Sequence, residues 1–171
     1  MIRPHHPLSP VEVAAIAGCP INVIKYQDLD ELENISQIFS SAGCALLLYE
    51  TQVNQGHWVC LIDHPDSIIF FDSYGLEPDN QLAFTNIEFR RRNDMMCPHL
   101  TALLEESPKK IFYNDKRLQL MTPEIFTCGY WVGYRMRKRK LTTEQFNNLF
   151  KGIPRQEKDN AIIILSQKYL D

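Results

Sequence analysis

The sequence contains no long apolar run. All of its apolar segments fall short of the roughly 20 residues that cross a bilayer, so we expect no membrane-spanning helix. The opening residues, MIRPHHPLSP, have no apolar signal core, so we expect the protein to remain inside the cell rather than be secreted. The sequence also has no internal repeat and no low-complexity tract. We expect a single domain over residues 1–171.

Cysteines are few and irregularly spaced. They form no C-x-x-C pair and no regular Cys/His pattern, so a zinc site and a disulfide framework are both poorly supported. Reduced thiols in a cytosol-like or nuclear compartment fit better. The five cysteines are Cys19, Cys44, Cys60, Cys97 and Cys128.

An excess of positive charge is lacking as well. Eighteen Lys and Arg residues against 21 Asp and Glu give a formal net charge of −3, which provides no overall attraction to nucleic acid, although local basic patches remain. Hydrophobic residues make up 44% and charged residues 23% of the chain, as in ordinary soluble domains. A chain of 171 residues buries about 70% of its unfolded surface.

Helical and strand patterns alternate in the first half. Ser9-Pro10-Val11-Glu12 has the pattern of a capped helix start and predicts a short helix ending near Gly18. Apolar residues at helical spacing predict an amphipathic helix from Asp28 to about Ser40. The runs CALLLYE, HWVCLID and SIIFFDS predict strands, and the break HPDS between the last two predicts an antiparallel hairpin.

The second half is richer in helical patterns. HLTALLEE, TTEQFNNLFKG and the segment from Cys128 to about Lys140 predict helices, FRRRNDMM fits a helix or a loop, and IFYN fits a strand. QEKDNAIIILSQKYL predicts a last helix, although AIIIL is equally strand-like. These elements predict an α+β fold with a central, mostly antiparallel sheet flanked by helices.

A cysteine and a glycine begin one of the predicted helices, in IFTCGYWVGY. Cys128 would lie at the helix N-terminus, where unpaired amides and the helix dipole favour the thiolate that attacks carbonyls. Gly129 beside it would let a substrate backbone come close. The alternative is that Cys128 is only a buried core thiol.

A nucleophilic cysteine needs a base, a group that orients the base and donors for the oxyanion. His57 begins a predicted strand and Asp72 ends the strand that pairs with it, so the hairpin would bring both to one end of the sheet. Asp72 has the alternative role of capping the turn before Gly75. Gln119 has a side-chain amide that could join the Cys128 backbone N–H as an oxyanion donor.

These residues, in this order, resemble the adenovirus protease and SUMO-specific protease clan of cysteine peptidases. GHWVCLIDHPDSIIFFDSYG is similar to the clan's His-Trp strand pair with its acidic residue, and TCGYWV is similar to its nucleophile helix. The resemblance covers residues 44–135 and is greatest to compact maturation proteases of double-stranded DNA viruses and virus-like mobile elements. Gln119 lies slightly farther from the cysteine than in the clan, and a small insertion including Pro123 would explain this.

The resemblance implies a papain-like cysteine endopeptidase mechanism that needs no metal. Cys128 would be the nucleophile, His57 the base, Asp72 its orienting acid and Gln119 the oxyanion donor, while Trp58 would shape the substrate groove with Gly129. The implied substrate is a polypeptide cleaved after small, Gly-type residues, such as a capsid precursor. The implied location is a virion or the host cytoplasm or nucleus, and a DNA or peptide activator is implied as well.

The run RMRKRK is the main basic cluster. Basic residues in the last turn of a helix are favoured by the helix dipole, which explains the run without a partner. The alternative is DNA contact, to which FRRR would add if the two surfaces met. The residues of this candidate nucleic-acid surface are Arg135, Arg137, Lys138, Arg139 and Lys140.

Three other functions stay open on the sequence. A deconjugase acting on SUMO- or ubiquitin-like modifiers would use the same residues as a maturation protease. A catalytically silent module could keep the groove to bind Gly-rich tails. A DNA-bound structural factor would be built around RMRKRK.

Overall fold

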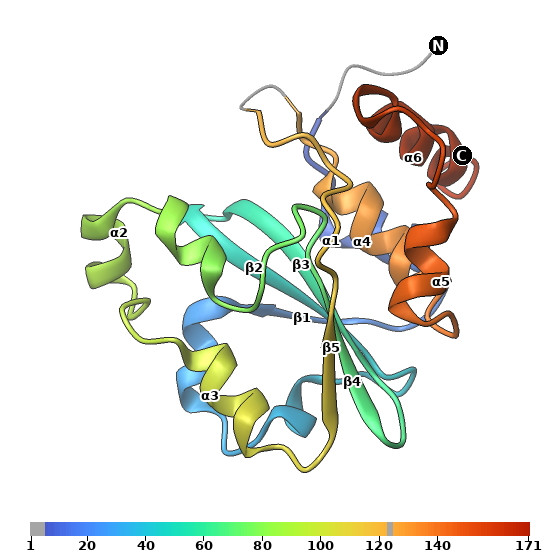
Figure 1. Ribbon diagram of the computed structural model, residues 1–171. Coiled ribbons are helices and arrows are strands. Elements are labelled where there is room, and N and C mark those ends of the chain that lie inside the picture. The colour runs from blue at the N-terminus through green and yellow to red at the C-terminus, as the bar shows by residue number, and fades with distance from the viewer. Residues whose placement is uncertain (1–5, 123–124) are drawn as a thin grey trace.

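The computed structural model describes residues 6–122 and 125–171, so Pro123 of the expected insertion lies outside the described residues. A five-stranded sheet forms the centre of the molecule, and helices cover both of its faces (Figure 1). The predicted α+β fold class is therefore confirmed.

The sheet has the strand order β1-β2-β3-β4-β5. Its middle strands β2, β3 and β4 pair antiparallel, and β3 and β4 form the predicted hairpin. The edge strands β1 and β5 pair parallel with their neighbours, so the sheet is mixed rather than mostly antiparallel. Parallel neighbours must be joined by a crossover connection. The connections from β1 to β2 and from β4 to β5 are accordingly long and contain helices. The strands are Asn22–Lys25 (β1), Cys44–Gln52 (β2), Gln55–Asp63 (β3), Ser67–Phe71 (β4) and Lys110–Tyr113 (β5).

The helices agree with most of the sequence patterns, and the strand-like AIIIL is part of the last helix. In the described part of the chain, every helix is too short or too polar to traverse a membrane. The α-helices are Pro10–Ala17 (α1), Ile87–Arg92 (α2), His99–Glu106 (α3), Cys128–Arg137 (α4), Thr143–Asn148 (α5) and Lys158–Gln167 (α6). The 3-10 helices are Tyr26–Glu31 (η1), Ile35–Ile38 (η2), Asn80–Phe84 (η3) and Arg155–Glu157 (η4).

Helix α1 begins and ends as its sequence predicts. The Ser9 hydroxyl accepts a hydrogen bond from the Glu12 backbone N–H, and the Glu12 carboxylate accepts one from the Ser9 N–H. Gly18 ends the helix in the left-handed conformation, with φ of 67°, which costs glycine nothing. This local chemistry sets the length of α1, which packs against α4 next to the site described below.

The amphipathic α-helix predicted over 28–40 is wrong. The chain forms the two 3-10 helices η1 and η2 there, separated by extended residues, and Asn34 caps the second. Its apolar residues recur at intervals of three, which matches the three residues per turn of a 3-10 helix better than an α-helix.

The sheet separates two apolar cores, and strand β2 contributes side chains to both of them. Its side chains alternate between the sheet faces, so Leu46 and Leu48 join the core under α1, α4 and α6, whereas Leu47 and Tyr49 join the core under η1 and α3. Burial on both faces explains why CALLLYE is continuously apolar. The sheet is therefore a rigid support for the residues at its ends.

Candidate active site

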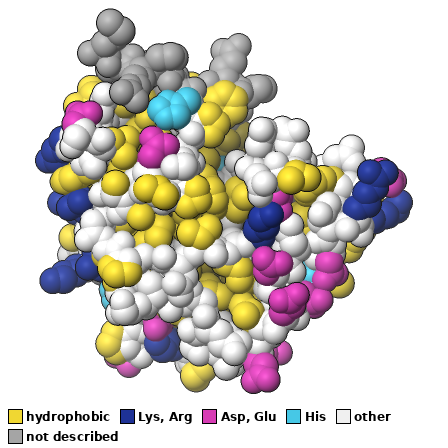
Figure 2. Space-filling model, turned by 180° about the vertical axis from the view of Figure 1, so that it is seen from behind, with side chains coloured by type: hydrophobic (Ala, Val, Ile, Leu, Met, Phe, Trp, Pro, Cys, Tyr) yellow, Lys and Arg dark blue, Asp and Glu magenta, His cyan; other side chains and the backbone are white. Residues whose placement is uncertain are grey.

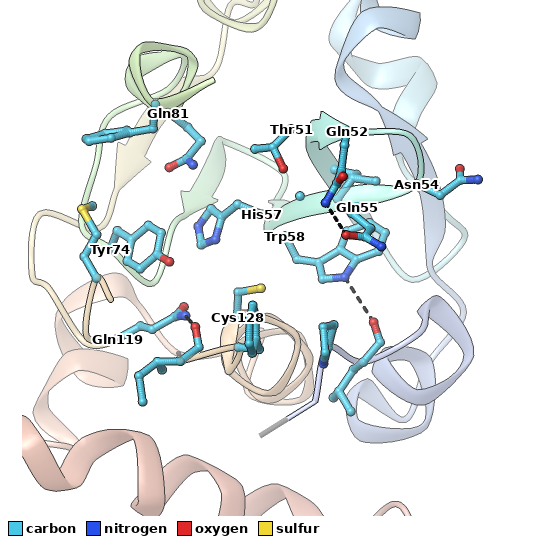
Figure 3. Close-up of a pocket in the computed structure, with 18 of the residues that line it drawn as sticks. Thr51, Gln52, Asn54, Gln55, His57, Trp58, Tyr74, Gln81, Gln119 and Cys128 are labelled. Carbon is cyan, nitrogen blue, oxygen red and sulfur yellow. Dashed lines mark hydrogen bonds between the residues drawn. The ribbon is translucent and has the colours of Figure 1, made fainter. Parts of the chain in front are cut away.

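A cavity of about 880 Å³ opens beside the end of the sheet where β3 begins. Its walls come from five separate parts of the chain: the start of α1 with the segment before it, the β2–β3 hairpin, Tyr74 after β4, η3, and the start of α4 with the segment before it. His57, Gln119 and Cys128 all line it, and Figure 3 shows the His57 ring and the Cys128 sulfur on facing sides. The fold thus brings together residues that are up to 71 positions apart in the sequence.

The β3–β4 hairpin places His57 beside Asp72. Cys60 pairs with Phe71 in the register, so the start of β3 and the residue after β4 lie at one end of the sheet. The His57 Nε2 and Asp72 Oδ1 atoms are 2.8 Å apart, and both side chains are buried. The same Oδ1 accepts a hydrogen bond from the Tyr74 backbone N–H, also at 2.8 Å. With Nε2 held by Asp72, Nδ1 is the ring nitrogen left for Cys128.

Electrostatics favour a charged His57. Burial alone would lower the pKa of its imidazole, but the charge and hydrogen bond of Asp72, together with Cys128, raise it to about 10. The imidazole is therefore protonated at neutral pH. An imidazolium is the partner that stabilises the thiolate of a neighbouring cysteine.

Cys128 differs from the strand cysteines in its surroundings. It is the first residue of α4, borders the cavity and contacts His57. Cys44 begins β2 and Cys60 lies inside β3, and burial raises the pKa of both thiols, that of Cys44 to about 12. Cys97 is exposed and does not line the cavity. Among these four, Cys128 alone combines a helix N-terminus with an imidazolium.

Gln119 is held rigidly at the cavity wall. Its Oε1 accepts a hydrogen bond of 2.6 Å from the Ser73 hydroxyl, and its Nε2 donates to the Ile125 carbonyl at 3.3 Å. The backbone N–H of Gln119 also donates to the Ser73 carbonyl. Because an amide nitrogen has two hydrogens, Nε2 retains one for a ligand in the cavity.

Trp58 lies on the opposite side of Cys128 from Gln119 (Figure 3). Its indole Nε1 donates to the Leu8 carbonyl at 3.3 Å, which fixes the ring as a cavity wall.

The structure does not support the prediction that Gly129 admits the substrate, because Gly129 is buried and is not among the cavity residues. A Cβ on Gly129 would lie 2.8 Å from the Leu8 Cβ. Gly129 therefore makes room for Leu8, not for a ligand.

Adding a methyl group at this contact should destabilise the protein. We expect Gly129→Ala to cost about 1–3 kcal/mol through overpacking against Leu8, which lowers Tm by several degrees in a chain of this size. Thermal unfolding of Gly129→Ala, Leu8→Ala and the double variant measures the coupling. In the Leu8→Ala background the Gly129→Ala change should cost clearly less. Equal costs in both backgrounds would show that Leu8 is not the obstacle.

Tyr74 is a site residue that sequence reasoning missed. Its ring stacks on the His57 imidazole with a centroid distance of 4.2 Å and an angle of 10°. Burial, followed by the charges of Cys128 and Asp72, raises the pKa of its hydroxyl, so Tyr74 stays neutral. The ring therefore limits rotation of His57. An aromatic residue two positions after Asp72 carries no distinguishing signal in a single sequence.

The basic run is used largely inside the protein. Arg135 is buried, and its guanidinium donates to the Lys138 and Leu141 carbonyls and covers the Phe146 ring. Burial lowers the pKa of Arg135 to about 10. The assignment of Arg135 to a nucleic-acid surface is therefore wrong, because its charge does not reach solvent.

The other basic side chains of the run form no continuous patch with FRRR. Arg137 donates to the Ile16 carbonyl and lies over the Tyr169 ring, and Arg139 donates to the Met136 carbonyl. Helix α2, which carries FRRR, lies on the far side of the molecule from α4 (Figure 1). Figure 2 shows the Lys and Arg side chains of one face of the molecule in separate small groups, with apolar, uncharged and acidic surface between them. DNA contact through Lys138, Arg139 and Lys140 stays a prediction.

Comparison with known proteins identifies one relative with substantial identity. The chain is 33% identical over 140 residues to "Uncharacterized protein V9" of Sputnik virophage, a match that covers 81% of this chain and 80% of that protein. No protein-family model matches.

Two solved structures of the ASFV pS273R protease also match. One has a TM-score of 0.49 at 13% identity and covers 92% of this chain and 66% of that chain. The other has a TM-score of 0.42 at 15% identity, with 85% and 57% covered. The chain therefore spans less than two thirds of the length of these proteases.

Proposed function

The chain belongs to the same family as the Sputnik virophage protein V9, and we propose that it is a cysteine endopeptidase. One observation carries the proposal: Cys128, at the N-terminus of α4, faces an imidazole that Asp72 orients, at the wall of a large cavity. This is the arrangement that nucleophilic catalysis by a thiol requires.

The proposed reaction uses these side chains and water. The Cys128 thiolate attacks the carbonyl carbon of the scissile peptide, and the negative charge on the oxygen is stabilised by the Gln119 amide and the Cys128 backbone N–H. The His57 imidazolium gives its proton to the leaving amine as the C–N bond breaks, and a thioester remains. His57 then takes a proton from water, hydroxide attacks the thioester carbonyl, and the C–S bond breaks to release the acid, which restores the Cys128 thiolate beside the His57 imidazolium. Asp72 holds the ring throughout.

The cavity favours an uncharged polypeptide. Among the described residues that line it, His57 and Glu12 are the titratable side chains besides Cys128 and Tyr74, and no Lys or Arg is present. Gln52, Asn54 and Gln55 of the β2–β3 hairpin supply carboxamides that can pair with a peptide backbone. We propose small, Gly-type residues before the cleaved bond and viral structural precursor proteins as the natural substrate.

An active-site-directed thiol probe tests the proposal. We expect a peptide-based electrophile with a Gly-Gly terminus to label Cys128 ahead of the exposed Cys97, as mapped by mass spectrometry, and matching Gly-Gly peptides to be hydrolysed. A SUMO- or ubiquitin-like probe that reacts much faster than the short peptide would show a deconjugase instead. Absence of both labelling and hydrolysis would contradict the proposal and favour a silent peptide-binding module.

A further inference from the structure

A buried carboxylate lies outside the proposed reaction. Asp159, on helix α6, is 3% exposed and does not line the cavity. Helix α6 packs against α4 and so brings this acidic residue close to the start of the nucleophile helix (Figure 1). Burying a carboxylate is costly unless hydrogen bonds compensate, so its partners indicate its role.

Asp159 accepts three hydrogen bonds from α4 and the segment before it. Its Oδ2 accepts from the Leu120 backbone N–H at 2.9 Å. Its Oδ1 accepts from the Trp131 indole N–H at 3.0 Å and from the Thr127 hydroxyl. Hydrogen bonds to an ionised acceptor are stronger than neutral ones, so the three contacts form a firm anchor.

Two of these donors are chain neighbours of the oxyanion donors. Leu120 follows Gln119, and Thr127 precedes Cys128. Thr127 occupies the N-cap position of α4, yet its side chain makes no cap hydrogen bond and bonds Asp159 instead. One carboxylate therefore holds the two points of the chain that set where the Gln119 amide and the Cys128 N–H lie.

We propose that Asp159 is a positioning residue for the oxyanion site. The proposal rests on the proposed protease function: Asp159 fixes the separation of Gln119 and Cys128 without touching substrate. Stabilisation of a developing oxyanion depends on donors held in place before the reaction. Loss of the anchor should therefore impair attack on a peptide carbonyl while leaving the thiol and imidazole pair intact.

The Asp159→Asn variant separates positioning from general stability. Asparagine keeps an acceptor for Thr127 and Trp131 but presents an N–H₂ group toward the Leu120 N–H. Hydrolysis requires the oxyanion donors, whereas alkylation by iodoacetamide, a displacement at a saturated carbon, requires only the activated thiolate. We expect kcat for a Gly-Gly peptide to fall about 10- to 100-fold, with KM and the alkylation rate of Cys128 within about twofold of wild type.

Three comparison variants sharpen this test. Glu157→Gln removes an exposed charge two residues away and should leave both rates unchanged. Gln119→Ala should reproduce the selective loss of hydrolysis. If Asp159→Asn folds poorly, Thr127→Val removes one of the three donors and should give a smaller loss of the same kind. Equal losses of hydrolysis and alkylation, or no loss, would overturn the proposal.

Hydrogen exchange tests, independently of catalysis, whether Asp159 holds the Leu120 segment in place. In Asp159→Asn the Leu120 amide should exchange at least about tenfold faster than in wild type, while amides in β3 keep their protection. An unchanged exchange rate of the Leu120 amide would show that Asp159 does not anchor this segment, even in an active enzyme. If the wild type hydrolysed no peptide, the protease function would fail, and the exchange result would still show whether Asp159 holds this segment.

Discussion

Replacing Cys128 with alanine is expected to lower kcat/KM for a Gly-Gly peptide by about 10⁴-fold or more, because no other group can form the thioester. The fold should persist. Cys128 is 8% exposed, and removing one sulfur atom beside a large cavity should cost on the order of 1 kcal/mol. Hydrolysis is measured with purified variants of matched thermal stability, so that lost activity is not confused with unfolding.

The matched control for this variant is Cys97→Ser. Cys97 is the exposed free thiol, so its replacement should change neither hydrolysis nor stability. Substrate binding to Cys128→Ala should remain, because the walls formed by Trp58 and Gln119 are untouched, and the inactive variant should hold uncleaved peptide. Hydrolysis by Cys128→Ala near the wild-type rate would show that Cys128 is not the nucleophile.

Local sequence patterns predicted the elements whose signals are local. The Ser9 capping box, the apolar run of β2 and the turn HPDS each specify a structure within a few residues, and each forms as expected. The position of His57 beside Asp72 follows from the same logic, because a hairpin fixes which residues share its open end.

The features that sequence reasoning missed depend on contacts between distant residues. Strand β1 is only four residues long and gains its partners from β2, and the three-residue spacing in η1 and η2 is close enough to an α-helical period to mislead. Asp159 lies 31 positions beyond Cys128, in a segment with no catalytic pattern. The prediction for Gly129 failed because the residue that packs against it, Leu8, is distant in the sequence, so a local pattern does not reveal the contact.

The charge of Asp72 is the second feature whose loss should have a large effect. In Asp72→Asn the Oδ1 atom can still accept from Tyr74 and the size of the side chain is unchanged, so the main changes are the loss of the charge and an N–H₂ group in place of Oδ2. We expect kcat to fall about 10²- to 10⁴-fold. Without the carboxylate, burial still lowers the pKa of His57 and the main cause that raises it is gone, so the ring should be less protonated at pH 7 than in the wild type.

The pH dependence of alkylation tests this electrostatic cause. In the wild type, the alkylation rate of Cys128 should fall less steeply with decreasing pH than in Asp72→Asn, because the His57 imidazolium stabilises the reacting thiolate. In Asp72→Asn the rate should fall about tenfold per pH unit, as for an unassisted thiol below its pKa of roughly 8.5. Asp115→Asn, which removes an exposed carboxylate, is the matched control and should keep the wild-type profile.

The same charge pair makes stability depend on pH in a defined direction. The pKa of His57 is raised from 6.5 in the unfolded chain to about 10 in the fold, so its contribution is complete below pH 6.5 and is lost as the pH rises through about 10. The difference in unfolding free energy between wild type and Asp72→Asn should therefore be largest below pH 6.5 and shrink toward pH 10. Chemical denaturation at several pH values measures it. A difference that grew with pH would mean that Asp72 does not hold His57 in its charged form.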